Sequence, residues 1–294
     1  MGNSVTELDP IALSNILTLR YDPTQKPLLP KIEAEDFLNS NKSPSIDFVE
    51  KTIQNYIKTQ IPNDTKNVCI ALSGGVDSTL VMALLRKTHP DIQIDALSVR
   101  FANSVDESSS AARIADHFGA KHHIIEVDNY LKNLPESINI IKMPFWDLHW
   151  FNVVKRARSL SEYLFSGDGG DEIFGGYVFR YKKFLTLTKD DSTIEDKIKA
   201  YLQCHERDNV PDQENIFGQK SQFSWNVIYN TVSKYFENNL SRLDQVFLAD
   251  YNGKLLYNFS LINTRLHDHF KVKSIPPSLS KELLSYVIPL SNRF

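Results

Sequence analysis

Cysteine is scarce in this chain. Only Cys69 and Cys204 occur among 294 residues, too few for a disulfide framework, and we therefore expect a reducing, cytoplasmic location. Long apolar runs are missing as well. No stretch of about 18 uncharged apolar residues occurs, so we expect no membrane-spanning helix.

An excess of charge of either sign is also absent. Lys and Arg total 33, Asp and Glu total 36, and the net charge is −3. This balance gives no general attraction to nucleic acid or to anionic lipid, so neither is expected as a partner. The content of 41% hydrophobic and 23% charged residues is ordinary for a globular protein. Any polyanion must therefore be bound by a local site.

Alternation of strands and helices is the main pattern of the first half of the chain. Apolar runs predict strands at 67–72, 93–99, 122–127 and 162–165. The intervening periodicity predicts helices from Ser45, from about Asp77, at 106–118, near 128–141 and at 147–160. This order is typical of an α/β fold with a doubly wound parallel sheet. Ligands of such sheets bind outside the carboxyl ends of the strands.

The remaining segments lack this alternation. Residues 1–44 contain PTQKPLLP and have no clear periodicity, so we expect an extended arm. Residues 45–177 form the predicted α/β domain. Residues 178–294 combine helical periodicity with many aromatic side chains, which predicts a mainly helical C-terminal region.

A loop rich in small residues follows the first predicted strand. Residues 72–78 read LSGGVDS, and Ser73, Gly74 and Gly75 lead into a helix whose first N–H groups face an incoming ligand. With the hydroxyls of Ser73 and Ser78, they predict a site for phosphate or pyrophosphate. The Walker A pattern is absent, because no lysine follows the glycines. Asp77 would repel a phosphate unless Mg²⁺ lay between them; alternatively, it only stabilises the first helical turn.

A second loop, SGDGGDE at 166–172, follows the last predicted strand. Because both loops begin where strands of one parallel sheet end, we expect them to open onto one crevice. Opposite a phosphate loop, Asp171 becomes a second Mg²⁺ ligand. Asp168 or Glu172 can then polarise a substrate or accept a proton.

The first loop resembles the pyrophosphate-binding loop of the ATP-pyrophosphatases, an adenine nucleotide alpha-hydrolase-like class. The stretch SGDGGDEIFGGY resembles the second signature of its asparagine synthetase and β-lactam synthetase group. The resemblance covers residues 10–181 and returns weakly near 245–290. It implies the following binding residues for ATP: Leu72, Ser73, Gly74, Gly75, Asp77, Ser78, Val99, Ser166 and Gly167. It further implies Asp77 and Asp171 as Mg²⁺ ligands and catalytic roles for Asp168 and Glu172.

The resemblance also implies a reaction. The β-carboxylate of aspartate attacks ATP, giving β-aspartyl-AMP and pyrophosphate, and ammonia then displaces AMP. A glutamine-hydrolysing member carries a nucleophilic cysteine at position 2, where this chain has Gly2, so we expect free ammonia or a separate glutaminase subunit as nitrogen source. Three alternatives stay open: another carboxylate, a tRNA base, or a non-catalytic nucleotide-binding subunit lacking a C-terminal lysine loop. Homo-oligomerisation is also left open.

Overall fold

A computed structural model describes residues 9–38, 43–101, 108–129, 131–143, 148–205, 213–217 and 221–290. The chain divides into two compact units. The α/β unit comprises Ser40–Phe174 and Ile262–Phe294, and the helical unit comprises Met1–Asn39 and Gly175–Leu261.

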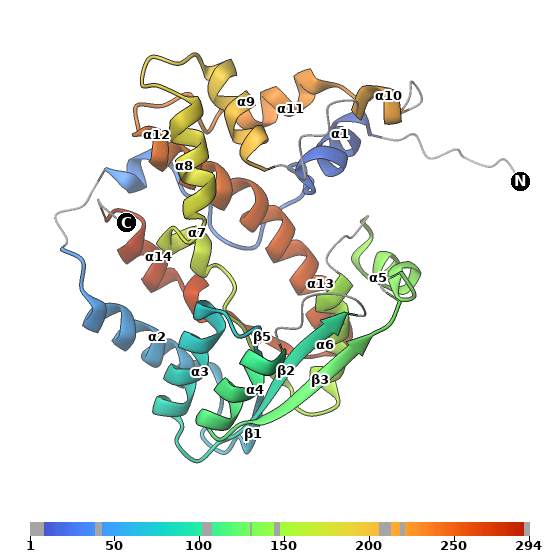
Figure 1. Cartoon of the computed structure of the whole chain (residues 1–294), viewed down its shortest axis with the longest axis vertical. Coiled ribbons are helices and arrows are strands. Elements are labelled where there is room, and N and C mark those ends of the chain that lie inside the picture. Colours follow the sequence, from blue (N-terminus) through green and yellow to red (C-terminus); the bar gives the residue numbers. More distant parts are fainter. Residues whose placement is uncertain are drawn as a thin grey trace, which may run out of the picture. The chain divides into compact units, whose positions relative to one another are not determined.

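The α/β unit is built on a five-stranded parallel sheet (Figure 1). Its strand order is β3-β2-β1-β4-β5, and every neighbouring pair is parallel. The order reverses between β1 and β4, which makes their carboxyl ends the topological switch point at which ligands bind in such sheets. The strands are β1 Asn67–Ala71, β2 Gln93–Phe101, β3 Lys121–Val127, β4 Tyr163–Phe165 and β5 Lys273–Ile275.

Helices cover both faces of this sheet. On one face, Cys69, Leu97 and Leu164 pack with α5, α6 and α13 in one apolar cluster. Alternate strand residues point to the opposite face, where α3 and α4 contact β1 and β2. The predicted doubly wound parallel α/β fold is thus confirmed. The helices of this unit are α2 Ile46–Gln60, α3 Val76–Thr88, α4 Ser108–His117, α5 Leu134–Ile141, α6 Leu148–Arg158, α7 Gly170–Phe174, α13 Ser260–Phe270 and α14 Lys281–Val287, with a 3₁₀ turn at Pro277–Leu279.

Local sequence signals account for most of these elements. Helix α2 begins at the predicted cap, where Ser45 Oγ accepts a hydrogen bond from Phe48 N at 3.2 Å, and its Ile53 and Ile57 are fully buried. The predicted helix near 128–141 begins later, at Leu134, with Pro135 in its first turn. Pro144, expected to break the helical pattern between the two predicted helices, lies outside the described residues.

Two elements differ from the expectations. The arm expected at 1–44 contains α1 Pro10–Leu19, which is capped by Asp9. This helix was not predicted because its buried face carries Ser14, Asn15 and Thr18 and shows no apolar periodicity. Strand β5 occurs inside the region 178–294, which was expected to be mainly helical. Residues 262–294 group with the α/β unit, because β5 pairs with β4.

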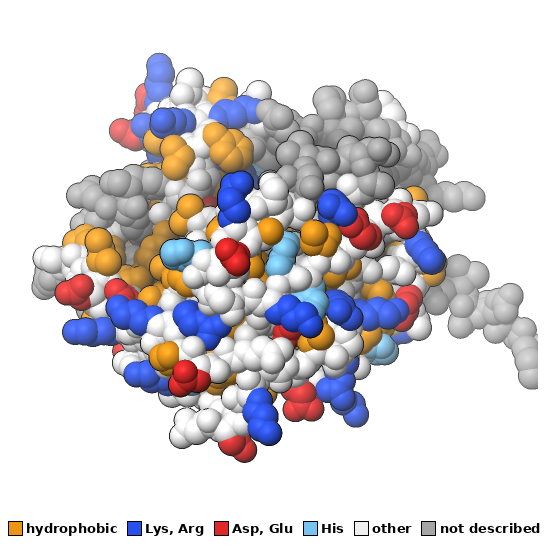
Figure 2. All heavy atoms as spheres, turned by 60° about the horizontal axis from the view of Figure 1, so that its bottom comes forward, with side chains coloured by type: hydrophobic (Ala, Val, Ile, Leu, Met, Phe, Trp, Pro, Cys, Tyr) orange, Lys and Arg blue, Asp and Glu red, His pale blue; other side chains and the backbone are white. Residues whose placement is uncertain are grey.

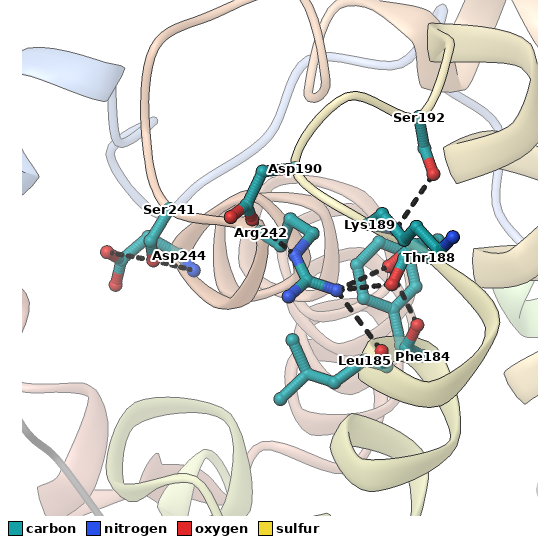
Figure 3. Close-up of polar contacts among 9 residues, drawn as sticks. All are labelled: Phe184, Leu185, Thr188, Lys189, Asp190, Ser192, Ser241, Arg242 and Asp244. Carbon is teal, nitrogen blue, oxygen red and sulfur yellow. Dashed lines mark hydrogen bonds and ion pairs between the residues drawn. The ribbon is translucent and has the colours of Figure 1, made fainter.

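The helical unit contains a half-buried arginine that joins two of its helices. Arg242 begins α12, and its guanidinium donates to Leu185 O at 3.1 Å and to Thr188 O at the end of α8 (Figure 3). It thereby satisfies carbonyls that a helix end leaves without partners. This unit holds α1, α8 Val178–Leu187, α9 Ile194–Cys204, α10 Gln213–Phe217, α11 Trp225–Ser233, α12 Arg242–Ala249, a π-helix at Asp250–Phe259 and a 3₁₀ turn at Ala34–Phe37.

The surface of the α/β unit mixes both signs of charge. On the face turned forward in Figure 2, Lys and Arg side chains are interspersed with Asp and Glu. Among the described helices, none combines the length and the apolar character needed to cross a bilayer.

Candidate functional site

The first loop leaves strand β1 and enters helix α3. Leu72 N donates to Leu97 O at 2.8 Å, so the sheet ladder extends one residue beyond β1. Gly74 has φ +83°, and a Cβ there would lie 3.1 Å from Ser110 Cβ. The left-handed φ favours glycine at this position, and the 3.1 Å distance is tighter than most real Cβ contacts. Gly75 caps α3 without a side-chain hydrogen bond, so the start of this helix retains donors for an anion.

Hydroxyl groups gather inside this loop. Ser73 Oγ and Ser78 Oγ lie 3.2 Å apart, Ser73 N donates to Ser78 Oγ at 3.3 Å, and Gly75 N donates to Ser73 Oγ at 3.2 Å. Two hydroxyls and two backbone donors predicted to bind phosphate therefore lie together and orient one another.

The second loop runs from β4 into helix α7. Its first residue, Ser166, is buried and donates its N–H to Ile275 O of β5 at 3.2 Å. Gly169 has φ +84°, and a Cβ there would lie 2.2 Å from Leu279 Cδ2. Neither Ile275 nor Leu279 was predicted to contribute to the site. The only sequence signal for them is the weak resemblance near 245–290.

The two loops meet at their glycines. A Cβ on Gly167 would lie 2.6 Å from Ser78 N, and a Cβ on Gly170 would lie 2.4 Å from Asp77 Oδ1. Such distances are far shorter than van der Waals contact, so only glycine lets the backbone of the second loop approach Asp77. The two loops therefore lie together, and their opening onto one crevice stays a prediction.

Two carboxylates, those of Asp77 and Asp171, lie close enough to influence one another electrostatically. Burial and, secondarily, the charge of Asp171 raise the pKa of Asp77. Such repulsion between like charges is relieved by a divalent cation. Within the described residues, His, Cys, Asp and Glu form no group of three that could hold a metal. Two carboxylates nevertheless fit Mg²⁺, which proteins usually bind through one or two carboxylates plus substrate phosphates.

The other candidate residues border the same region. Asp168 and Glu172 are half-buried and flank Asp171 along the second loop and α7. Val99, also half-buried, packs beside the apolar cluster from the carboxyl half of β2. The two strands that lead into the loops, β1 and β4, flank the switch point of the sheet, and β2 is the neighbour of β1.

Comparison with known proteins gives the family. The family model described as "Asparagine synthase" matches residues 49–293. The asparagine synthetase [glutamine-hydrolyzing] of Bos taurus is 29% identical over 179 residues, which covers 55% of this chain and 29% of that protein. A putative asparagine synthetase [glutamine-hydrolyzing] of Methanocaldococcus jannaschii is 29% identical over 143 residues, covering 47% of this chain and 28% of the relative. The chain thus spans less than a third of the length of these relatives.

Among solved structures, an NH3-dependent NAD synthetase from Campylobacter jejuni is similar at 17% identity. The match covers 68% of this chain and 100% of that one, with a TM-score of 0.33, too low to bear on function. The family model covers most of the chain, including both glycine-rich loops and β5. This protein therefore belongs to the asparagine synthase family, a family of ATP-dependent amidating ligases.

Proposed function

We propose that this chain adenylates the β-carboxylate of aspartate with ATP and then amidates it with ammonia, releasing AMP and pyrophosphate. The observation that carries the proposal is the packing of Gly170 against the Asp77 carboxylate. Asp171 directly follows Gly170 in the chain, and its charge contributes to the raised pKa of Asp77. Two acidic groups beside a loop of hydroxyls and backbone donors suit a metal-bound triphosphate.

In this proposal the first loop binds the pyrophosphate part of ATP. Ser73, Gly74, Gly75 and Ser78 would supply hydroxyl and N–H donors, and each bond to a charged oxygen is worth about 1.5–3 kcal/mol. Because the hydroxyls of Ser73 and Ser78 already lie 3.2 Å apart, they need little reorganisation to face one phosphate group. Leu72, Val99, Ser166 and Gly167 would border the nucleoside.

Asp77 and Asp171 would hold Mg²⁺, which when bound neutralises phosphate charge as the α-phosphorus is attacked. The half-buried Asp168 and Glu172 lie beside Asp171, where they would orient the acceptor and take up a proton from the incoming nitrogen. Positioning and charge neutralisation then account for most of the barrier reduction.

The test is the acceptor dependence of pyrophosphate release. The chain is incubated with ATP, Mg²⁺, aspartate and an ammonium salt, and pyrophosphate, AMP and asparagine are measured. Release that requires aspartate and yields asparagine supports the proposal. Release that requires another carboxylate or a tRNA, or ATP binding without turnover, contradicts it.

The nitrogen source is tested with the same assay. We propose free ammonia or a separate glutaminase subunit, so glutamine alone should not replace the ammonium salt. Asparagine formed from glutamine by the purified chain would contradict this part. Sedimentation of the same sample tests for a homo-oligomer, and fractionation of cells tests the cytoplasmic location.

A further inference from the structure

A buried serine holds the carbonyl group at the exit of strand β1. Ser98 Oγ lies 2.6 Å from Leu72 O and 2.9 Å from His122 Nε2. Ser98 belongs to β2 and His122 to the neighbouring strand β3. Three adjacent strands thus contribute to one line of hydrogen bonds that ends at the first residue of the loop.

The proton count gives the direction of each bond. A carbonyl oxygen only accepts, so the single hydroxyl proton of Ser98 goes to Leu72 O. Ser98 Oγ can then only accept from His122, and His122 Nε2 must carry a proton. Burial and, secondarily, the charge of His123 lower the pKa of His122. Near neutral pH, the ring is therefore neutral, with its one proton on Nε2.

The peptide group held by Ser98 is also held from its other side. Leu72 O and Ser73 N belong to the same planar peptide unit, and Ser73 N donates to Ser78 Oγ at 3.3 Å. Ser98 therefore fixes one end of this unit and Ser78 fixes the other. A tilt of the peptide that followed loss of the Ser98 bond would displace the Ser78 hydroxyl.

We propose that His122 and Ser98 are positioning residues of the phosphate loop, acting through a relay from His122 Nε2–H to Ser98 Oγ–H to Leu72 O. The relay sets the plane of the Leu72–Ser73 peptide and hence the place of Ser73 and Ser78. It rests on the proposed function only in naming ATP as the ligand of the loop. The arrangement of the relay itself is judged without ATP.

Ser161 offers a matched control. Its hydroxyl donates to Asn67 O at 3.0 Å, and the side chain is as buried as that of Ser98. Asn67 is the first residue of β1, whereas Leu72 directly follows the last. Ser98→Ala and Ser161→Ala thus each remove a serine-to-carbonyl hydrogen bond at opposite ends of the same strand. Each also removes one hydrogen bond that the hydroxyl accepts, from His122 Nε2 in Ser98 and from Tyr163 N in Ser161. A purely structural role predicts the same result for both.

The first measurement uses the protein without nucleotide. ¹⁵N-histidine NMR should show His122 protonated on Nε2, and hydrogen exchange of the Ser73 amide should become faster in Ser98→Ala but not in Ser161→Ala. A proton on Nδ1 of His122 in the wild type, or equal Ser73 exchange in both variants, overturns the relay.

The second measurement uses ATP with Mg²⁺. Ser98→Ala should raise the Kd about tenfold, equivalent to about 1.4 kcal/mol, and Ser98→Thr, which keeps the hydroxyl, should restore it. His122→Leu should weaken ATP binding, and His122→Gln, which keeps an N–H donor, should not. If Ser98→Ala does not fold, these two variants test the relay in its place. Unchanged ATP binding in Ser98→Ala and His122→Leu overturns the positioning role. If the wild type binds no ATP, the proposed function fails. The His122 tautomer and the exchange rate of the Ser73 amide still test the relay in that case.

Discussion

Gly170 lies directly against the carboxylate of Asp77, so that a Cβ on Gly170 would come within 2.4 Å of Asp77 Oδ1. This contact joins the two glycine-rich loops, and a side chain at position 170 would have to displace the Asp77 carboxylate. The geometry of the acidic pair therefore depends on a residue that itself has no functional group.

Gly170→Ala should displace the Asp77 side chain and lower aspartate-dependent pyrophosphate release about 100-fold, which is the order of loss expected when a catalytic group is misplaced. A double-mutant cycle with Asp77→Ala separates this effect from general damage. Because the clash is with Asp77, Gly170→Ala should cost much less unfolding free energy in the Asp77→Ala background. An equal loss of unfolding free energy in both backgrounds would mean that Gly170→Ala does not clash with Asp77.

Asp77→Asn should abolish pyrophosphate release but increase the stability of the metal-free protein. The raised pKa of Asp77 means that the folded state binds a proton more tightly than the unfolded state does. Stability is therefore lost as pH rises from the unfolded pKa of 3.8 through the raised folded value. At pH 7, removing the charge should raise the melting temperature. Thermal unfolding curves of both proteins are measured with and without Mg²⁺ and nucleotide, which should stabilise only the wild type. Equal stabilisation of the variant would contradict the metal role.

Asp168→Asn should preserve ATP binding and slow adenylation. Asp168 lies on the second loop, three residues before the proposed Mg²⁺ ligand Asp171, and is not itself assigned to the phosphates. Equilibrium binding of ATP and single-turnover formation of AMP distinguish the two steps, with Glu172→Gln as the companion variant. Unchanged single-turnover rates in both variants would mean that these carboxylates have only a structural role in the second loop.

Arg242→Ala should destabilise the helical unit by about 2 kcal/mol, the scale of hydrogen bonds made by a charged group. Its guanidinium binds the last carbonyls of α8. Asp190→Asn is the control, because Asp190 also pairs with Arg242, at 2.7 Å, but is 93% exposed. Exposed ion pairs contribute little, so this variant should unfold like the wild type in urea. A larger loss in Asp190→Asn than in Arg242→Ala would reverse this assignment.

His267 should make the α/β unit sensitive to acid. Burial lowers its pKa to about 4, and its Nδ1 donates to Val272 O at 2.8 Å. A depressed histidine pKa means that the unfolded state gains the proton first, so stability is lost as pH falls from about 6.5 to about 4. The loss amounts to about 3 kcal/mol at most. His267→Asn, which keeps a donor near Nδ1, should flatten the unfolding free energy in this range. An unchanged slope would exclude His267 as the cause.

The sequence predicted those parts of the fold whose signals are local. Ile53 and Ile57 recur at helical spacing and are fully buried, and the four predicted strands all occur. Strand β5 was missed because its three residues, Lys273–Ile275, include one apolar side chain, whereas the equally short β4 reads as an apolar run, Tyr163–Phe165. Its partner β4 lies more than 100 positions earlier, and pairing over such a separation leaves no trace in local periodicity.

The candidate site was predictable to the level of its loops. Glycine density and carboxylates pointed to residues 72–78 and 166–172, and the parallel sheet implied that they meet. The contact of Gly167 and Gly170 with Ser78 and Asp77 depends on tertiary packing. Ser98 and His122 looked like ordinary strand residues, since a side-chain relay across three strands has no sequence spacing of its own.

The pairing of β5 with β4 has a consequence for synthesis of the chain. A ribosome makes residues 175–261 after β4 and before β5, so the sheet cannot be completed until translation has passed Ile275. Domains usually fold in order from the N-terminus. Here the nascent α/β unit has no partner strand for the edge of β4 until β5 has been translated. Such an edge invites association with other chains. Chaperone protection during translation should therefore matter more for this protein than for one with a contiguous sheet.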